Sequence, residues 1–375
     1  MDTDKSILIY VLRQKFHNIQ YIKMKNTAHN IYIHVPFCMS KCNYCAFFSH
    51  ACSAPDWDKY TRDICTEINY WGGRLGKIDI PTIFFGGGTP SLMPISAFEK
   101  IITTIAQNFN INTCSEITIE SNPKTLDKQK LIEFQQNGLT RLSVGVQSLN
   151  DDKLKFLGRR HNAHDALELI HNAQDLGLRT SADFIYGLPN ETVNDVINTC
   201  HQINKLELNH CSMYELTIEP NTPFGKMNLN MPSNDTMAQM YNSIPEHLNL
   251  PRYEVSNYAK IGSECIHNQN VWDGAPYIGI GTGAAGRIYI NGTWYEQMGN
   301  NEKFEKLSDN VRATEKIITG MRTIRGCQLT DDVKNVIDIN WVNKNPELVQ
   351  IQDNRISATQ SGILILDEIM INLVR

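Results

Sequence analysis

Residues 33–47 read Ile33-His-Val-Pro-Phe-Cys38-Met-Ser-Lys-Cys42-Asn-Tyr-Cys45-Ala-Phe47, and three of the ten cysteines of the chain lie in this stretch. Thiolates are soft ligands that suit zinc or iron–sulfur clusters. The C-x3-C-x2-C spacing supplies one thiolate fewer than a closed structural zinc site requires, and no histidine follows at zinc-finger spacing. Three thiolates on a cubane leave one iron open for a chelating ligand. We therefore expect Cys38, Cys42 and Cys45 to hold a [4Fe–4S] cluster, with zinc as the alternative.

The cysteine stretch directly follows an apolar run at 31–35, the first of six runs rich in Ile, Val, Phe and Tyr. Segments with helical periodicity separate these runs, and Gly138 and Gly177 stand where helices should end. Repeating strand–helix units predict parallel strands in an incomplete barrel, with chemistry at the C-terminal ends of the strands. The predicted strands are 31–35, 82–85, 116–120, 141–146, 181–185 and 211–217, and the predicted helices include 95–108, 127–137, 163–176 and 192–206.

The pattern changes after residue 235. A glycine-dense stretch at 277–286 predicts a strand and a tight turn, followed by a strand at 287–290. Helical patterns at 311–323 and 331–343, a hairpin at 355–358 and 362–366, and a last helix predict a small winged-helix-like α+β module with a packing role. The expected division is a poorly ordered leader at 1–29, a core barrel at 30–235, a glycine-rich extension at 236–305 and the C-terminal module at 306–375.

The bulk composition excludes some classes of protein. The 375 residues carry a formal net charge of -5, so there is no basic field to attract a nucleic acid. The only apolar run of the leader, 7–12, is too short to span a bilayer, so membrane contact is peripheral at most. Neither a disulfide framework nor an export signal is evident, which favours reduced thiols in the cytoplasm.

Several motifs together resemble one family. The cysteine stretch is similar to the radical S-adenosylmethionine signature in its CxxxCxxCxF form, as found in the haem chaperone family HemW, which is related to oxygen-independent coproporphyrinogen III dehydrogenase. The resemblance covers nearly all of residues 30–375. The other matching stretches are Phe85-Gly-Gly-Gly-Thr-Pro-Ser91, Glu120-Ser-Asn-Pro123, Gly145-Val-Gln-Ser148, Leu157-Gly-Arg-Arg-His161, Asp183-Phe-Ile-Tyr-Gly-Leu-Pro189 and Leu216-Thr-Ile-Glu-Pro-Asn-Thr222.

The resemblance also implies a pocket for S-adenosylmethionine. On the residues alone, Glu120, Gln147 and Asp183 are polar positions in apolar strand runs, which fits either buried salt bridges or ligand contacts. Glycines after the second strand would let backbone atoms approach a ligand ammonium group. The family implies that the pocket consists of Tyr32, Gly87, Gly88, Thr89, Glu120, Gln147, Arg159 and Asp183.

Two functions remain open. One is a haem chaperone that binds haem and passes it to an acceptor protein, with a cluster and S-adenosylmethionine in place. The other is a radical enzyme that oxidises coproporphyrinogen III, with an electron donor for its cluster. Phe47 stands where the dehydrogenase branch usually has a cysteine, so the resemblance favours the chaperone without dehydrogenase activity.

The candidate haem ligand is His267, in the stretch His267-Asn-Gln-Asn-Val-Trp272, which is similar to an HNxxYW haem motif. An imidazole is a sound axial ligand for haem iron. Two residues depart from the family pattern. Val271 replaces the tyrosine of this motif, and Ala285 replaces the histidine of a Gly-Ala-His turn. Both are expected near one haem face, where they would weaken haem binding.

Overall fold

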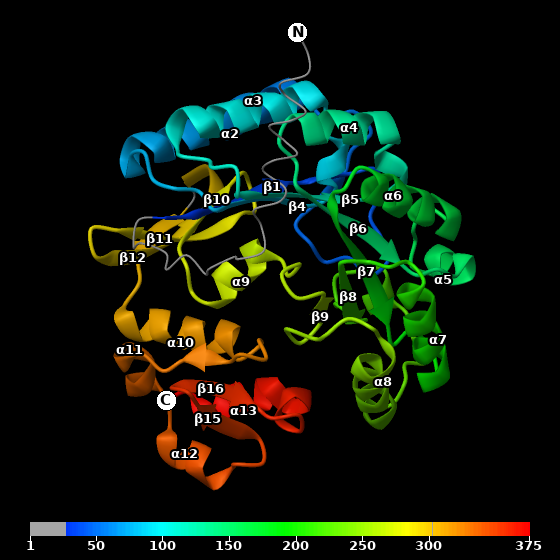
Figure 1. Cartoon of the computed structure of the whole chain (residues 1–375), viewed down its shortest axis with the longest axis vertical. Coiled ribbons are helices and arrows are strands. Elements are labelled where there is room, and N and C mark those ends of the chain that lie inside the picture. Colours follow the sequence, from blue (N-terminus) through cyan, green and yellow to red (C-terminus); the bar gives the residue numbers. More distant parts are fainter. Residues whose placement is uncertain (1–27, 302) are drawn as a thin grey trace.

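The computed structural model describes residues 28–301 and 303–375, so the leader predicted at 1–29 lies outside the described part except for its last two residues. The described residues form a curved sheet of 11 strands with helices on its outer face, and the main hydrophobic core lies between the sheet and these helices (Figure 1). Six consecutive parallel strands form its centre, in chain order. They are β1 (Asn30–Val35), β4 (Thr82–Gly87), β5 (Glu116–Ser121), β6 (Arg141–Gln147), β7 (Arg179–Tyr186) and β8 (His210–Glu215).

The predicted partial barrel is confirmed, because each predicted strand overlaps one of these six and the sheet does not close. Its two edges are extended by later parts of the chain. Antiparallel β9 (Asn257–Ala259) joins β8, and β10 (Tyr277–Ile280) joins β1 in parallel. The antiparallel strands β11 (Ala285–Ile290), β12 (Thr293–Met298) and β13 (Lys303–Lys306) continue from β10.

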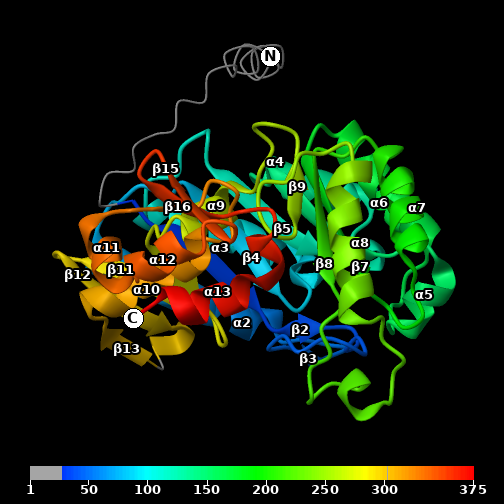
Figure 2. The same ribbon diagram turned by 90° about the horizontal axis from the view of Figure 1, so that it is seen from below.

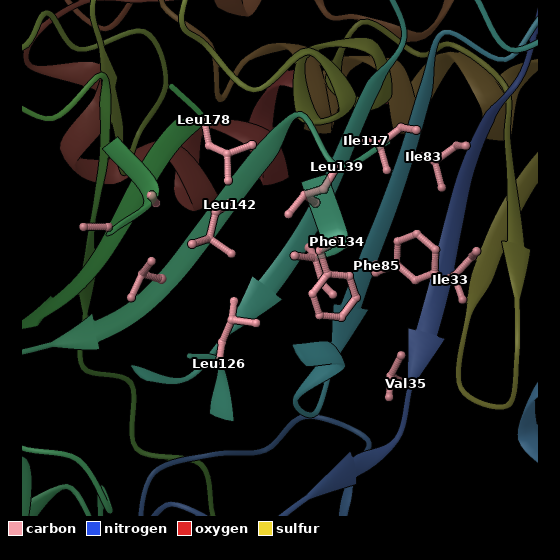
Figure 3. Packing of buried hydrophobic residues seen from close by; sticks show 14 of the residues in the cluster. Ile33, Val35, Ile83, Phe85, Ile117, Leu126, Phe134, Leu139, Leu142 and Leu178 are labelled. Carbon is pink, nitrogen blue, oxygen red and sulfur yellow. The ribbon is translucent and has the colours of Figure 1, made fainter. Parts of the chain in front are cut away.

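The outer helices are amphipathic, and their apolar faces cover the sheet. Ile33 and Phe85 point outward from β1 and β4 toward Phe134 of α4 (Figure 3). Because side chains alternate along a strand, the residues between them point into the barrel. The helices are α2 (Trp57–Leu75), α3 (Ile95–Asn108), α4 (Lys128–Gln136), α5 (Asp151–Phe156), α6 (Ala163–Asp175), α7 (Val193–Asn204) and α8 (Asn234–His247).

The predicted ends of these helices have physical causes that the structure shows. The Asp127 carboxylate accepts the Lys130 amide at 2.8 Å and caps α4. Gly138 and Gly177 follow α4 and α6 with φ of 103° and 69°, a left-handed conformation that glycine adopts without a Cβ penalty. Three of these helices, α2, α5 and α8, have no counterpart among the predicted ranges.

The C-terminal module has a hydrophobic cluster of its own. This cluster supports a domain boundary at residue 306, which stays a proposal. The hairpin prediction is half wrong. Its first strand is β16 (Arg355–Ala358), but 362–366 is helical, and the partners of β16 are β14 (Cys327–Gln328) and β15 (Val349–Gln352). A short apolar run does not distinguish a strand from a helical turn. The helices are α10 (Asp309–Gly320), α11 (Asp331–Val336), α12 (Ile339–Lys344) and α13 (Leu366–Leu373), so the predicted helix 331–343 is broken in two.

No helix in the described ranges combines the length and the apolar character that crossing a bilayer requires.

Candidate functional site

The three clustered cysteines lie on one loop at the C-terminal end of β1. The short strands β2 (Phe37–Cys38) and β3 (His50–Ala51) pair and close this loop, and the Cys52 amide donates to the Cys38 carbonyl at 2.9 Å. Cys38 is buried, while Cys42 and Cys45 are half-buried. The loop is therefore held at its base and presents its thiols at the mouth of the barrel, where strand-end chemistry is expected.

Positive groups surround these sulfurs. Arg159 Nη1 donates to Cys42 Sγ at 3.3 Å, and a charge-assisted hydrogen bond of this kind stabilises a sulfur that carries negative charge. Lys41 Nζ donates to the Phe47 carbonyl at 2.8 Å. Burial raises the pKa of the Cys45 thiol, whereas the Phe47 backbone and Lys41 act in the opposite direction. Bound iron would oppose the effect of burial in the same way, because it takes the thiolate as a ligand.

The glycines after β4 are required by close contacts. Gly87 has φ of 111°, and a Cβ on it would lie 2.6 Å from the His34 ring. A Cβ on Gly88 would lie 2.9 Å from Cys38 Sγ. The Gly87 amide donates to Glu120 Oε2 at 3.1 Å. This backbone therefore forms a cradle between the cysteine loop and the Glu120 carboxylate.

The polar residues predicted on β5, β6 and β7 point into the same mouth. Gln147 ends β6 at a bulge with φ of 66°, a conformation that non-glycine residues rarely adopt and that redirects the side chain. A Cβ on Gly145 would lie 2.9 Å from Gln147 Nε2 and 3.3 Å from Arg159 Nη2. Asp183 accepts from Ser143 Oγ at 3.0 Å. Tyr32, Gly87, Gly88, Glu120, Gln147, Arg159 and Asp183 are all partly accessible, and Thr89 is buried behind them.

Two carboxyl groups of this mouth are held near one another away from bulk water. Burial, reinforced by the Asp183 charge, raises the pKa of Glu120 to about 8, although the Gly87 amide acts against it. Burial also raises the pKa of Asp183, against hydrogen bonds from Ser212 and Ser143. Without a ligand, Glu120 is thus mostly protonated at neutral pH. A cation placed beside it would favour the carboxylate.

Sequence reasoning missed Asn122, which lies at the centre of the network. Its Nδ2 donates to Thr89 Oγ1 at 3.0 Å, and its Oδ1 accepts from Arg159 Nη2, which also donates to the Gly145 carbonyl at 2.8 Å. Asn122 lies within the quoted stretch Glu120-Ser-Asn-Pro123, so its position in that motif was the available signal. It lines a cavity of about 190 Å³ beside the cysteine loop, together with Met39, Ser40, Cys42, Lys124, Thr125, Gly158, Arg159, Arg160 and His161.

His267 lies at the other end of the barrel. It belongs to helix α9 (Ile266–Trp272) and is only 4% exposed, and its role as haem ligand stays a prediction. Its ring packs on Phe84 with centroids 5.1 Å apart, and its Nδ1 lies 2.7 Å from Thr82 Oγ1 at the start of β4. Figure 2 shows α9 on the side of the strands opposite to the β2–β3 loop.

A chain of hydrogen bonds fixes the tautomer of His267. Asn30 Nδ2 donates to the Pro276 carbonyl at 3.1 Å, so Asn30 Oδ1 faces Thr82 and accepts its hydroxyl proton at 2.8 Å. Thr82 Oγ1 must then accept from His267 Nδ1–H. Burial, only partly opposed by Glu116, lowers the pKa of His267 to about 4. The imidazole is therefore neutral, with its lone pair on Nε2.

The two departures from the family pattern are not at one face, which corrects the expectation above. Val271 lies on α9 at the floor of the barrel. Ala285 begins β11 next to a turn in which a Cβ on Gly283 would lie 2.3 Å from the Phe48 ring of the cysteine loop. One departure thus affects the His267 end and the other affects the cysteine end.

The chain is similar to several known proteins. Residues 32–203 match the family model described as Radical SAM superfamily. The chain is 37% identical to "Heme chaperone HemW" of Escherichia coli K12, over 69% of this chain and 70% of that protein. The protein of the same name from Bacillus subtilis is 34% identical over 70% of this chain and 71% of its own length. The solved structure of "Coproporphyrinogen III oxidase (HemN) from Escherichia coli" superposes with a TM-score of 0.76 at 18% identity, over 92% of this chain and 89% of that one, which shows a shared fold.

The match to the radical S-adenosylmethionine model and the identity to these curated relatives over more than two thirds of their length lead to one assignment: the chain belongs to the HemW family of radical S-adenosylmethionine proteins.

Proposed function

We propose that this protein is a haem chaperone that binds haem through His267 and transfers it to an acceptor protein. The observation that carries the proposal is the neutral His267 imidazole, whose Nδ1 proton is committed to Thr82 and whose lone pair remains on Nε2. A neutral imidazole with one nitrogen held by a hydrogen bond is the form in which histidine binds iron. The relatives named heme chaperones support the same role.

The cysteine end fits a [4Fe–4S] cluster and S-adenosylmethionine. The three thiols project from a single loop. Beside this loop, Gly87 and Gly88 leave space that a side chain would occupy, and Arg159 donates a hydrogen bond to Cys42 Sγ that would stabilise a thiolate. Within residues 28–301 and 303–375, no three His, Cys, Asp or Glu side chains converge closely enough to hold one metal ion. When bound, the reduced cluster supplies an electron that can cleave the sulfonium of S-adenosylmethionine.

The surrounding residues would hold the S-adenosylmethionine cofactor. The Gly87 and Gly88 backbone and Thr89 line the side where an amino group would lie, with the Glu120 carboxylate as its counter-charge. Gln147, Arg159, Asp183 and Tyr32 provide the remaining polar wall. A carboxylate that loses its proton when a cation binds would couple cofactor binding to pH.

A second candidate is coproporphyrinogen III oxidation, since the HemN structure shares the fold. The accessible mouth at the cysteine end suits a radical enzyme as well as a chaperone. Phe47 disfavours this candidate. It is 68% exposed at the position where the dehydrogenase branch usually has a cysteine. We further propose that an electron donor reduces the cluster. We also propose that the protein is located in the cytoplasm and contacts a membrane at most peripherally.

One anaerobic experiment separates the two functions. The reconstituted protein is titrated with haem and, in the same preparation, assayed for protoporphyrinogen formation with a reductant and S-adenosylmethionine. We expect one haem per chain and no porphyrinogen product. Formation of protoporphyrinogen would establish the enzyme instead.

The ligand assignment is tested with His267→Ala, for which we expect loss of the imidazole-ligated haem spectrum and weaker binding. The control is His164→Ala, which removes an exposed histidine on α6 far from α9 in sequence. A haem titration that is the same for His267→Ala and the wild type would show that another residue holds the iron.

A further inference from the structure

Helix α9 begins without help from its own sequence. Cys265 occupies its N-cap position and makes no side-chain capping bond. The backbone amides of Ile266 and His267, in the first turn of the helix, instead donate to Glu116, about 150 residues earlier in the chain. Glu116 Oε1 accepts from His267 N at 3.0 Å, and Oε2 accepts from Ile266 N at 3.2 Å. A residue of strand β5 therefore caps the helix that carries the candidate haem ligand.

The Glu116 carboxylate is buried and paired. It is 0% exposed, and its Oε2 lies 3.0 Å from Arg179 Nη2 at the start of β7. The Cys265 thiol also donates to Oε1, at 3.6 Å. Both carboxylate oxygens of Glu116 therefore accept hydrogen bonds from the start of α9, and Oε2 also contacts Arg179. Arg179 is 30% exposed while Glu116 is fully buried, so removing the Glu116 carboxylate would leave the helix amides without a partner in the interior.

The other end of α9 is attached to the C-terminal module. Asp273, which follows the helix, lies 2.9 Å from Arg325 Nη2 and 3.7 Å from Arg355 Nη2. Thr319 Oγ1 of α10 donates to the Trp272 carbonyl at 2.9 Å. Figure 1 shows α9 between the sheet and this module. The Asp273 and Arg325 side chains are 41% and 38% exposed, and exposed pairs contribute little.

We propose that Glu116 is the positioning residue of His267: it holds α9 in the floor of the barrel and thereby sets how accessible the His267 imidazole is, while the Asp273 contacts have a minor effect. The His267 ring packs on Phe84 and is only 4% exposed, so a shift of α9 would change how much of the ring a reagent or a haem can reach. The relevance of this control to haem rests on the proposed function, but the control itself does not.

The test measures modification of His267 by diethyl pyrocarbonate, followed on its peptide by mass spectrometry in the reconstituted full-length protein without haem. Glu116→Gln keeps the size of the side chain but removes its charge and one acceptor. We expect His267 to react at least about tenfold faster, which corresponds to the loss of one charge-assisted hydrogen bond. Glu116→Asp, which keeps the charge, should restore slow modification in part, and Asp273→Asn should change the rate by less than about threefold.

The matched control is Glu254→Gln. Glu254 is equally buried and lies 2.6 Å from Arg322, but its hydrogen bonds go to Ser256 and Asn257 rather than to α9. Equal acceleration in this control, or an unchanged rate in Glu116→Gln, would overturn the proposal. Should Glu116→Gln fail to fold, Glu116→Asp serves instead, because it shortens the side chain that reaches the two α9 amides, and a His267 rate equal to that of the wild type would overturn the proposal. None of these readouts uses haem, so their failure is separate from failure of the haem titration.

Discussion

Glu116 and Glu120 lie on the same strand and point into the same barrel, yet their environments are opposite. Glu116, at the floor, is compensated by Arg179 and two helix amides. Glu120, at the mouth, accepts one amide, faces Asp183 and has a pKa raised to about 8. Glu116 has a salt-bridge partner and two amide donors, whereas Glu120 has one amide donor, a repulsive Asp183 and only the longer-range charge of Arg141, which leaves it the better placed of the two for a cationic ligand. Glu116 therefore marks the end of the barrel that α9 closes, and Glu120, four residues further along β5, marks the open end with the cysteine loop.

The largest effect should come from Cys42→Ala at the open end. With two thiolates left and Arg159 deprived of its sulfur contact, we expect iron content after anaerobic reconstitution to fall from about four per chain to near zero. The measurement is iron and acid-labile sulfide per chain. Cys114→Ala removes an exposed thiol elsewhere and should keep the full iron content. Full iron content in Cys42→Ala would contradict the cluster assignment.

The next effect tests the cradle at the mouth. Gly87→Ala combines a left-handed backbone with a clash against the His34 ring, so we expect unfolding free energy to fall by about 3 kcal/mol. Gly292→Ala is the control: Gly292 also has a positive φ, 79°, but has open space around its Cβ, so the substitution should lower this free energy by only about 1 kcal/mol. Urea unfolding of the cluster-free proteins measures both. Equal losses would mean that the contact with His34 is unimportant.

A pH series on Glu120→Gln addresses the comparison directly. The folded pKa of Glu120 lies above its ordinary value of 4.5, so the folded wild type retains a proton that the unfolded chain loses, and its stability falls as pH rises from about 4.5 to 8. Glu120→Gln removes this loss and should be more stable than the wild type by roughly 1–3 kcal/mol at pH 9, with little difference near pH 4.5. Urea unfolding of cluster-free protein across this range is the measurement.

Glu116→Gln should instead be less stable than the wild type at neutral pH, because Arg179 and the α9 amides lose the carboxylate that they contact. If both glutamine variants respond alike, the two ends of β5 do not differ as described.

The smallest effect concerns Asn122. Asn122→Ala removes the group that orients Arg159 and Thr89 without touching the cysteines. We expect S-adenosylmethionine to bind about tenfold more weakly, close to 1.4 kcal/mol, with iron content unchanged. Calorimetry on the reconstituted protein gives the affinity. A parallel loss of iron would show that Asn122 supports the cysteine loop instead.

The parts that the sequence revealed are those with local causes. The six strands follow from short apolar runs, the start of α4 from the Asp127 cap, and its end from a glycine that adopts positive φ, and each of these signals depends on neighbouring residues. The cysteine spacing and the polar positions Glu120 and Asp183 were visible for the same reason.

What remained hidden depends on residues far apart in the chain. The burial of His267 is set by Thr82 and Glu116, and the cap of α9 comes from another strand, so no local pattern reports either. The placement of Val271 and Ala285 at opposite ends follows from the pairing of β10 with β1 and from where α9 packs. The helical turn at 362–365 was read as a strand because its apolar run is too short to show a period.

The pairing of β1 also has a consequence for synthesis of the chain. Asn30 lies beside Tyr277, so one edge of the first strand has no partner until nearly three quarters of the protein has left the ribosome. Until then β1, with the cysteine loop at its end, presents unpaired backbone groups of the kind that promote aggregation. Insertion of the cluster before β10 docks would therefore take place beside an exposed sheet edge that β1 itself forms.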